Sequence, residues 1–440
     1  MITDEQKKLA RWAMDFALKN GCRASRITMY SGTSSSYEIR DMKIDCLTQA
    51  SESRVRIQLF VDGRYGAFST NRLDKDELEK FIRNGIESTR YLAEDKAYTL
   101  PDPSLYYKGG GADLQLLDPH FNTIQPDDKV ALAMQVCDEI MGKDSRIISS
   151  TSSYGDEISA GYLIASNGFE GETVSSSYRL LGSVSIKGED SEARPESYWY
   201  DSSIFYDTLI KKGIGTKALE RTIRKLGQKK TASGRYSLVV DNMNSSRLLS
   251  PVVYALYGSS IQQKNSFLLD KLNRKVMGDK LTLTDEPHLP QSPGARYFDS
   301  EGVATGHLPV FEHGVLKTYY MDIYNANKLG VASTINSPSI LTMQMGDKDV
   351  NGLISLVEKG ILVTGFNGGN CNSSTGDFSY GVEGFLIENG KLTQAVSEMN
   401  ITGNMLTLWS QLAEAGNDTQ RNSSWKIPSL LFDGVDFSGL

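Results

Sequence analysis

The sequence predicts an α+β chain in two parts, with mixed and antiparallel β-sheets flanked by helices. Helical and strand-like periodicities both occur along its 440 residues, tight turns separate the strand-like segments, and no regular series of β–α–β units is present. A chain of this length favours two or three domains at roughly 100–200 residues each. The polar, glycine-bounded segment 227–234 marks the boundary. We therefore predict an N-terminal α+β domain over residues 1–226 and a C-terminal mixed α/β domain over residues 227–440.

The N-terminal part is predicted to begin with a helix, a β-meander and a second helix. Thr3 or Asp4 caps the first helix, and its apolar residues recur at helical spacing until Asn20-Gly21. Apolar and polar residues alternate from Val55 to Val61, and the Asp62-Gly63 turn then predicts a return strand over 64–70. The later segments predicted here are a helix from Asp74, an irregular connection over 97–125, a helix over 127–142, long antiparallel strands over 145–203 and a helix over 207–226.

The C-terminal part is predicted to mix short helices with strands and hairpins. Tyr236–Asp241 is apolar enough for a buried strand, and a helix follows over 245–258. His313-Gly314 and Asn389-Gly390 are typical of hairpin turns. Further helices are expected over 322–329, 348–359 and 401–414.

Charge and composition disfavour direct binding to nucleic acid or membranes. The formal net charge is −7, and the only dense basic stretch, Arg221–Lys230, alternates with apolar residues and is interpreted as a solvated helix face. The chain has no apolar N-terminal region and no run of about 20 apolar residues. Its four cysteines form no C-x-x-C pair, which suits a reducing compartment. A cytoplasmic protein is expected.

The residues do not predict a metal site or a nucleophile. The four histidines belong to no H-E-x-x-H motif, and the chain has no G-x-S-x-G sequence. Lys212–Lys217 lacks the spacing of a phosphate-binding loop and is interpreted as a helix-entry turn. Cys137 is expected to be a buried structural thiol, and Cys371 a structural cysteine in a loop without a nearby cation. No catalytic residue and no metal ligand is therefore assigned.

The glycine-rich segment 365–390 has two interpretations. Its glycines could open a strand edge to an extended peptide, which would add to the sheet by backbone hydrogen bonds. They could equally form a bulged, tightly turned core hairpin. If the segment binds peptide, the candidate residues are Asn372, Thr375, Gly376 and Asp377.

Five ordered segments over nearly the whole chain resemble the TldD/PmbA family. One lies in the N-terminal part, and the others follow one another in the C-terminal part. They are Gly63–Asn71, Ser374–Ser379 with Gly384–Lys391, Val396–Glu398, Ile401–Asn404 and Gly416–Asp418. Each segment alone is weak, and their order makes the joint signal strong.

The resemblance implies a protease subunit, and it distinguishes two branches. The TldD branch carries His-Glu-x-x-x-His on a helix early in the C-terminal domain, where a metal completes the site. Here the corresponding helix follows Arg247–Leu249 and continues as Ser250–Ala255, without histidine or glutamate. The chain is therefore similar to the TldE/PmbA branch: no cofactor is expected in it, and zinc is expected only in a TldD partner.

By the same resemblance, the expected partners are a TldD-type subunit and a peptide or unfolded protein substrate. Such a complex would carry out peptide proteolysis, and a homodimer is the second arrangement. Two other functions stay open. The chain could be a peptidase by itself, with His288, His307, His313 and Cys371 as the candidate residues. It could also be a non-enzymatic modulator of DNA gyrase, a role historically linked to the family.

Overall fold

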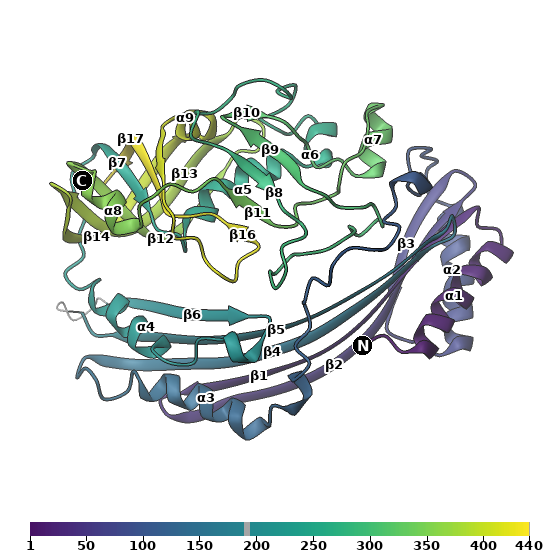
Figure 1. Cartoon of the computed structure of the whole chain (residues 1–440), viewed down its shortest axis with the longest axis horizontal. Coiled ribbons are helices and arrows are strands. Elements are labelled where there is room, and N and C mark those ends of the chain that lie inside the picture. The colour runs from purple at the N-terminus through teal and green to yellow at the C-terminus, as the bar shows by residue number, and fades with distance from the viewer. Residues whose placement is uncertain (189–193, 440) are drawn as a thin grey trace.

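The computed structural model describes residues 1–188 and 194–439. A long, curved antiparallel sheet forms the N-terminal part, and the C-terminal part lies over its concave face (Figure 1). The sheet has the strand order β3-β2-β1-β4-β5-β6. Its elements are α1 (Asp4–Lys19), β1 (Ala24–Arg40), β2 (Lys43–Val61), β3 (Arg64–Thr70), α2 (Lys75–Arg90), α3 (Pro126–Asp138), β4 (Ile147–Ala165), β5 (Phe169–Ile186), β6 (Glu196–Ser203) and α4 (Ile214–Ile223).

The α+β class is confirmed, and local signals set the ends of the first helices. Thr3 accepts a hydrogen bond from the Gln6 N–H and caps α1. Asp74 caps α2 in the same way, through the backbone N–H groups of Asp76 and Glu77. Gly213 has a φ of +80° and begins α4, so the interpretation of Lys212–Lys217 as a helix-entry turn is confirmed.

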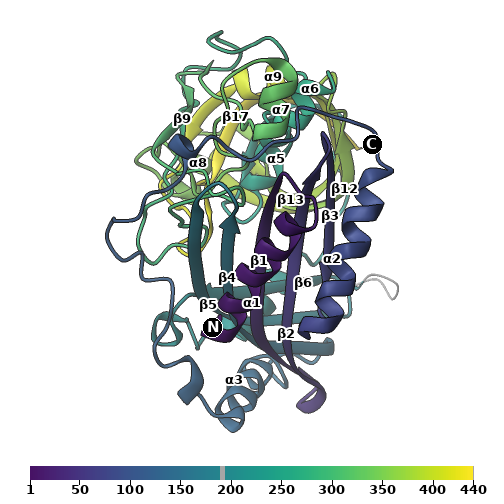
Figure 2. The same cartoon turned by 90° about the vertical axis from the view of Figure 1, so that its right-hand side faces the viewer.

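Alternation along the strands separates a helix-covered face of the sheet from a polar face. Val55, Ile57 and Leu59 of β2 are buried against α1 and α2. Arg54, Arg56 and Gln58 alternate with them and therefore point to the opposite, concave face. Figure 2 shows α1 and α2 on the outer side of the sheet, away from the C-terminal part. Cys137 of α3 is fully buried on the helix-covered face, as expected.

The C-terminal part contains two further sheets. One has the order β10-β9-β8-β11-β16, and the other has the order β14-β13-β12-β7-β17-β15. An additional pairing of β14 with β17 joins the second sheet into a closed ring of five strands, in which β7 and β12 run parallel. The strands are β7 (Gly234–Val240), β8 (Leu283–Asp285), β9 (Leu308–Glu312), β10 (Val315–Leu316), β11 (Leu341–Met343), β12 (Lys359–Cys371), β13 (Asp377–Glu388), β14 (Lys391–Asn404), β15 (Leu412–Ala415), β16 (Trp425–Lys426) and β17 (Leu430–Ser438). The helices are α5 (Ser245–Ala255), α6 (Gly258–Gln262), α7 (Ile323–Leu329), α8 (Val350–Ser355) and α9 (Met405–Ser410).

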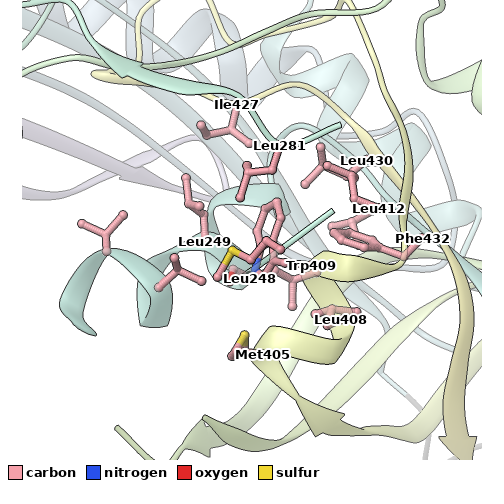
Figure 3. Packing of buried hydrophobic residues seen from close by; sticks show 14 of the residues in the cluster. Leu248, Leu249, Leu281, Met405, Leu408, Trp409, Leu412, Ile427, Leu430 and Phe432 are labelled. Atoms are coloured by element: carbon pink, nitrogen blue, oxygen red, sulfur yellow. Dashed lines mark hydrogen bonds between the residues drawn. The ribbon is translucent and has the colours of Figure 1, made fainter. Parts of the chain in front are cut away.

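The core of the C-terminal part surrounds Trp409. This side chain is fully buried on α9, and its indole N–H donates a 3.3 Å hydrogen bond to the Leu248 carbonyl of α5. The Phe432 ring of β17 meets it edge-on, with centroids 5.4 Å apart. Figure 3 shows how leucines from both helices and from neighbouring strands enclose the indole. α5 is therefore fixed to the strand ring by one apolar cluster.

Two expectations for helices are wrong. The helix expected over 401–414 is interrupted: β14 continues to Asn404, α9 is limited to 405–410, and β15 follows. Ile401 pairs with both Tyr380 of β13 and Phe437 of β17, and this non-local pairing overrides the local helical pattern. The helix expected over 348–359 is also shorter, because β12 already begins at Lys359.

Ion pairs join the two parts at both ends of the sheet. Lys225, just after α4, lies 2.6 Å from Glu383 of β13, and Arg221 of α4 lies 3.5 Å from Asp241. The side chains of Arg221 and Lys225 are 24% and 16% exposed. The interpretation of Arg221–Lys230 as a solvated helix face is therefore wrong for these two residues. At the other end, Arg26 of β1 lies 3.5 Å from Glu301.

Within residues 1–188 and 194–439, no helix combines the length and the apolar character that a bilayer crossing needs.

Candidate functional site

Helix α5 is the helix on which the resemblance to the family would place the metal ligands of a TldD-type subunit. Its buried face, including Leu248 and Val252, packs into the core. Its other face carries Arg247, Ser250 and Tyr254. The Arg247 guanidinium lies over the Tyr380 ring, 5.1 Å from its centroid, and donates a 3.2 Å hydrogen bond to the Gly369 carbonyl. The Arg247 guanidinium therefore connects this face of α5 to the glycine-rich part of β12.

The side chains of α5 do not fit the zinc ion that the resemblance implies for a catalytic branch. Zinc is held by His, Cys, Asp or Glu, and Arg247, Ser250 and Tyr254 provide none of these donors. The Ser250 hydroxyl instead donates to the Ser246 carbonyl within the helix. Among the residues that the structure describes, no three His, Cys, Asp or Glu side chains converge to hold a metal ion.

The three C-terminal histidines each contact a different group. The imidazole of His288 lies 3.2 Å from the Thr305 hydroxyl and packs against the Tyr297 ring. His307 Nδ1 lies 2.8 Å from the Glu286 carboxylate. His313 Nδ1 lies 3.2 Å from the Asp279 carbonyl, in the β9–β10 turn. These contacts give none of the three a partner arrangement typical of a nucleophile and its base.

Cys371 lies at the end of β12 and is only partly buried. Burial, with a smaller contribution from Asp377, raises the pKa of its thiol to about 11. A thiol nucleophile needs the opposite shift, produced by a cation or a base. Cys371 is therefore protonated at neutral pH, in keeping with the structural role expected for it.

The outer half of β12 is a free strand edge. β7 pairs with β12 only from Gly360 to Val363, whereas β13 follows β12 to Cys371 on the other side. In the described chain no strand pairs with residues 364–371 on the edge where β7 pairs with residues 360–363, and residues 367–370 are exposed. The register shifts between Phe366 and Gly369 show a bulge as well. The bulge agrees with the interpretation as a bulged hairpin, and peptide binding at the free edge stays a prediction.

Asn372, Thr375, Gly376 and Asp377 form the turn that ends this edge. The Asn372 side-chain oxygen accepts hydrogen bonds from the N–H groups of Ser374 and Thr375, at 2.9 and 3.3 Å. The Thr375 hydroxyl donates to Asp377, whose other oxygen accepts a bond from Asn404. These bonds, from Asn404 first and Thr375 second, hold the pKa of Asp377 below its ordinary value. Much of the turn's polar capacity is therefore used to close it against α9.

A cavity between the two parts was not predicted from the sequence. It encloses about 850 Å³ and lies between the concave face of the N-terminal sheet and residues 296–301, 322 and 336. Arg26, Arg54 and Arg56 line its floor. A neighbouring cavity of about 1030 Å³ is lined by serines of β5 and by residues 293–298. The alternation of Arg54, Arg56 and Gln58 was visible in the sequence, but nothing in it indicated what lies opposite.

Sequence profiles of one family match most of the chain. The PmbA/TldA metallopeptidase domain 1 matches residues 27–89, the central domain matches residues 119–226, and the C-terminal domain matches residues 233–439. The chain belongs to the PmbA/TldD metallopeptidase family.

Members of the PmbA/TldD family from other organisms align with the chain from end to end. The Haemophilus influenzae protein named Metalloprotease PmbA homolog is 27% identical over 99% of this chain and 96% of its own length. Metalloprotease PmbA of Escherichia coli O157:H7 is 24% identical over 99% of this chain and 97% of its own length. The resemblance to the family predicted from the five segments is thus confirmed.

Solved structures in the family share the fold. A Bacteroides thetaiotaomicron protein named "putative modulator of DNA gyrase" is 63% identical, with a TM-score of 0.98 and 100% of both chains covered. TldE from Thermococcus kodakarensis has a TM-score of 0.83 at 18% identity, covering 98% of this chain and 99% of its own. At that identity the likeness shows a common fold alone.

Proposed function

We propose that the chain is the metal-free, TldE-type subunit of a TldD/TldE metalloprotease complex in peptide proteolysis. One observation carries the proposal: the chain matches the metallopeptidase family along its length, yet α5 presents Arg247, Ser250 and Tyr254 where ligands would be needed. A family member without ligands can still shape a substrate channel and bind substrate. The catalytic zinc would belong to the TldD partner, in the cytoplasm.

The peptide would bind along the free edge of β12. An extended peptide pairs with unpaired backbone N–H and C=O groups of a strand edge, in a manner that tolerates many sequences. Residues 364–371 offer such an edge, apart from the Thr364 and Gly369 carbonyls, which accept hydrogen bonds from Asn244 and Arg247. Gly368 has open space around its Cα, so a peptide backbone can approach it closely. The turn formed by Asn372, Thr375, Gly376 and Asp377 would fix the end of this edge, and its exposed atoms would meet the end of the peptide.

A second free edge supports assembly with another subunit. β3 covers β2 only from Val55 to Val61, so the backbone of residues 43–54 is unpaired on that side. Ile44 and Leu47 are 51% and 52% exposed on this stretch. Long exposed strand edges with apolar side chains are ready to pair with another chain. We assign this edge to the TldD-type partner, with a homodimer as the competing arrangement.

Size-exclusion chromatography with light scattering tests the assembly. The purified chain is mixed with the TldD-type subunit of the same organism, and the mass of the eluting species is measured. A complex is expected for the unchanged chain, and its loss is expected for Ile44→Lys/Leu47→Lys. Tyr91→Lys, at an 89% exposed residue after α2, is the matched control and should leave the complex intact. If the two proteins elute separately, the proposed role as a TldD partner is contradicted.

A further inference from the structure

The cavity between the two parts has a floor and a roof with different chemistry. The floor is the concave face of the N-terminal sheet, and the roof comes from residues 296–301, 322 and 336 of the C-terminal part. Three arginines gather on the floor, whereas the roof carries Asp299, Glu301 and Asp322. The roof also carries Arg296, whose guanidinium donates hydrogen bonds to Ser337 and Ser339. The state of these charged groups decides which kind of ligand the cavity can bind.

The roof carboxylates are already engaged. Asp299 accepts backbone hydrogen bonds from Glu301, Val303 and Asn336, all between 2.9 and 3.0 Å. Glu301 accepts the Ile323 N–H at 3.0 Å. Asp322, in turn, caps α7 through the N–H and the side chain of Asn325. Asp299 and Asp322 therefore already bind within the protein, and the remaining Glu301 oxygen faces Arg26 at 3.5 Å.

The floor arginines, in contrast, retain unused donors. In the described chain Arg56 makes no hydrogen bond and no ion pair. Arg54 lies over the Tyr30 ring, 4.7 Å from its centroid, and its one ion pair is a 3.5 Å contact with the exposed Glu52. Arg26 is 7% exposed, and its Nη1 has no hydrogen-bond partner although Glu301 lies 3.5 Å away. Arg54 and Arg56 are exposed, so the cavity presents hydrated guanidinium groups with free N–H donors, together with the one unbonded Nη1 of Arg26.

The spacing of these arginines matches an extended chain. Arg54 and Arg56 are alternate residues of one strand, so their side chains leave the same face roughly 7 Å apart. Alternate side chains of an extended peptide have the same spacing. Each guanidinium can hold a carboxylate through two parallel N–H···O bonds.

We propose that Arg54 and Arg56 form a subsite for carboxylate groups of an extended peptide. Arg26 extends the subsite toward the middle of the sheet. The carboxylates could be acidic side chains or the C-terminal carboxylate, since both present the same group. The inference rests on the proposed peptide-binding function and names its substrate class: peptides with acidic residues or a free C-terminal end.

Fluorescence anisotropy with labelled octapeptides tests this subsite on the full chain. The probes are an alternating Asp/Ser peptide with an amidated C-terminus, an all-Ser peptide with a free carboxylate, and an all-Ser peptide with an amidated C-terminus. At about 50 mM salt, where screening is weak, at least one carboxylate-bearing peptide should bind about ten-fold more tightly than the amidated all-Ser peptide. The Asp/Ser probe reports acidic side chains, and the free all-Ser probe reports the chain end.

Arg54→Gln/Arg56→Gln should abolish this preference, and Arg54→Lys/Arg56→Lys should restore part of it. The control variant Arg72→Gln/Arg83→Gln removes the same two positive charges at exposed residues near α2, and it should leave the carboxylate preference unchanged. Equal melting curves of the variants show that the fold is retained. Peptide binding without a carboxylate preference, or a preference that survives Arg54→Gln/Arg56→Gln, would overturn the subsite and leave the proposed function intact. Failure of every probe to bind would contradict the proposed peptide binding together with the subsite, whereas the chromatographic test of assembly stands independently.

Discussion

Replacing Glu301 by glutamine removes the counter-charge of Arg26 at the contact between the two parts. The side chains of Arg26 and Glu301 are 8% and 13% exposed, so water from the adjoining cavity can replace only part of the lost interaction. Glutamine keeps an oxygen for the Ile323 N–H, which otherwise bonds to Glu301. The substitution therefore changes the charge and little else.

The expected magnitude follows from two opposing effects. At the 3.5 Å separation, two unit charges attract by about 5 kcal/mol with an effective dielectric constant of about 20. Burial raises the pKa of Glu301 despite the lowering effect of Arg26, so desolvation offsets much of that attraction. Breaking a buried pair by removing one partner typically costs about 3–5 kcal/mol. We expect Glu301→Gln to lower the free energy of unfolding by about 3 kcal/mol, at the low end of this range.

A double-mutant cycle separates the pair from other effects. Arg26→Met, Glu301→Gln and the double variant are compared by urea denaturation followed through tryptophan fluorescence at neutral pH. The double variant should be less destabilised than the sum of the single variants by about 2 kcal/mol, because it leaves no unpaired buried charge. Glu79→Gln, in the exposed pair with Arg83 on α2, is the control and should change stability by about 0.5 kcal/mol or less. Additive effects, or a stable Glu301→Gln variant, would refute the assigned role of the pair.

Three further predictions concern the C-terminal part. Trp409→Ala should lower the free energy of unfolding by about 3–5 kcal/mol, because it empties a fully buried site; an effect below about 1 kcal/mol in urea denaturation would contradict this packing. In a Cys46→Ser variant, which lacks the exposed thiol, Cys371 should react with iodoacetamide at pH 7 roughly 100-fold more slowly than an ordinary cysteine, since its pKa is about 11 instead of 9.0. The rate should rise with pH up to about 11, and a plateau near pH 8 would argue against the raised pKa. Gly376→Ala should lower the melting temperature and cost about 1–2 kcal/mol, because φ is +82° and a Cβ would lie 3.1 Å from Phe267; an unchanged melting temperature would count against this turn geometry.

The elements that could be predicted from the sequence are those specified by neighbouring residues. Thr3 and Asp74 mark helix starts through their own side chains, and Asp62-Gly63 dictates the β2–β3 turn. β1 was not predicted, because the serines over 31–36 show no apolar alternation. It forms because β2 and β4 pair with it along most of its length. The β4 residues that stabilise it are distant in the sequence, so the local pattern could not show them.

The candidate site also combines features set by neighbouring residues with features set by residues distant in the sequence. The glycine-rich turn at Gly376 and the missing ligands of α5 are local and could be read from the residues. The free edge of β12 depends on where β7 stops, at Val240, and this is a property of the sheet. The carboxylate subsite depends on the C-terminal part covering the concave face, so Arg54 and Arg56 alone could not reveal it.

The rate of peptide hydrolysis, measured while the chain is titrated into a fixed amount of its TldD-type subunit, tests the proposed role most directly. If the chain supplies substrate binding but no metal, the rate should climb to a plateau at a fixed stoichiometry, remain sensitive to chelation and be absent from the chain by itself. A flat titration, or chelator-sensitive hydrolysis by the chain without its partner, would contradict the account.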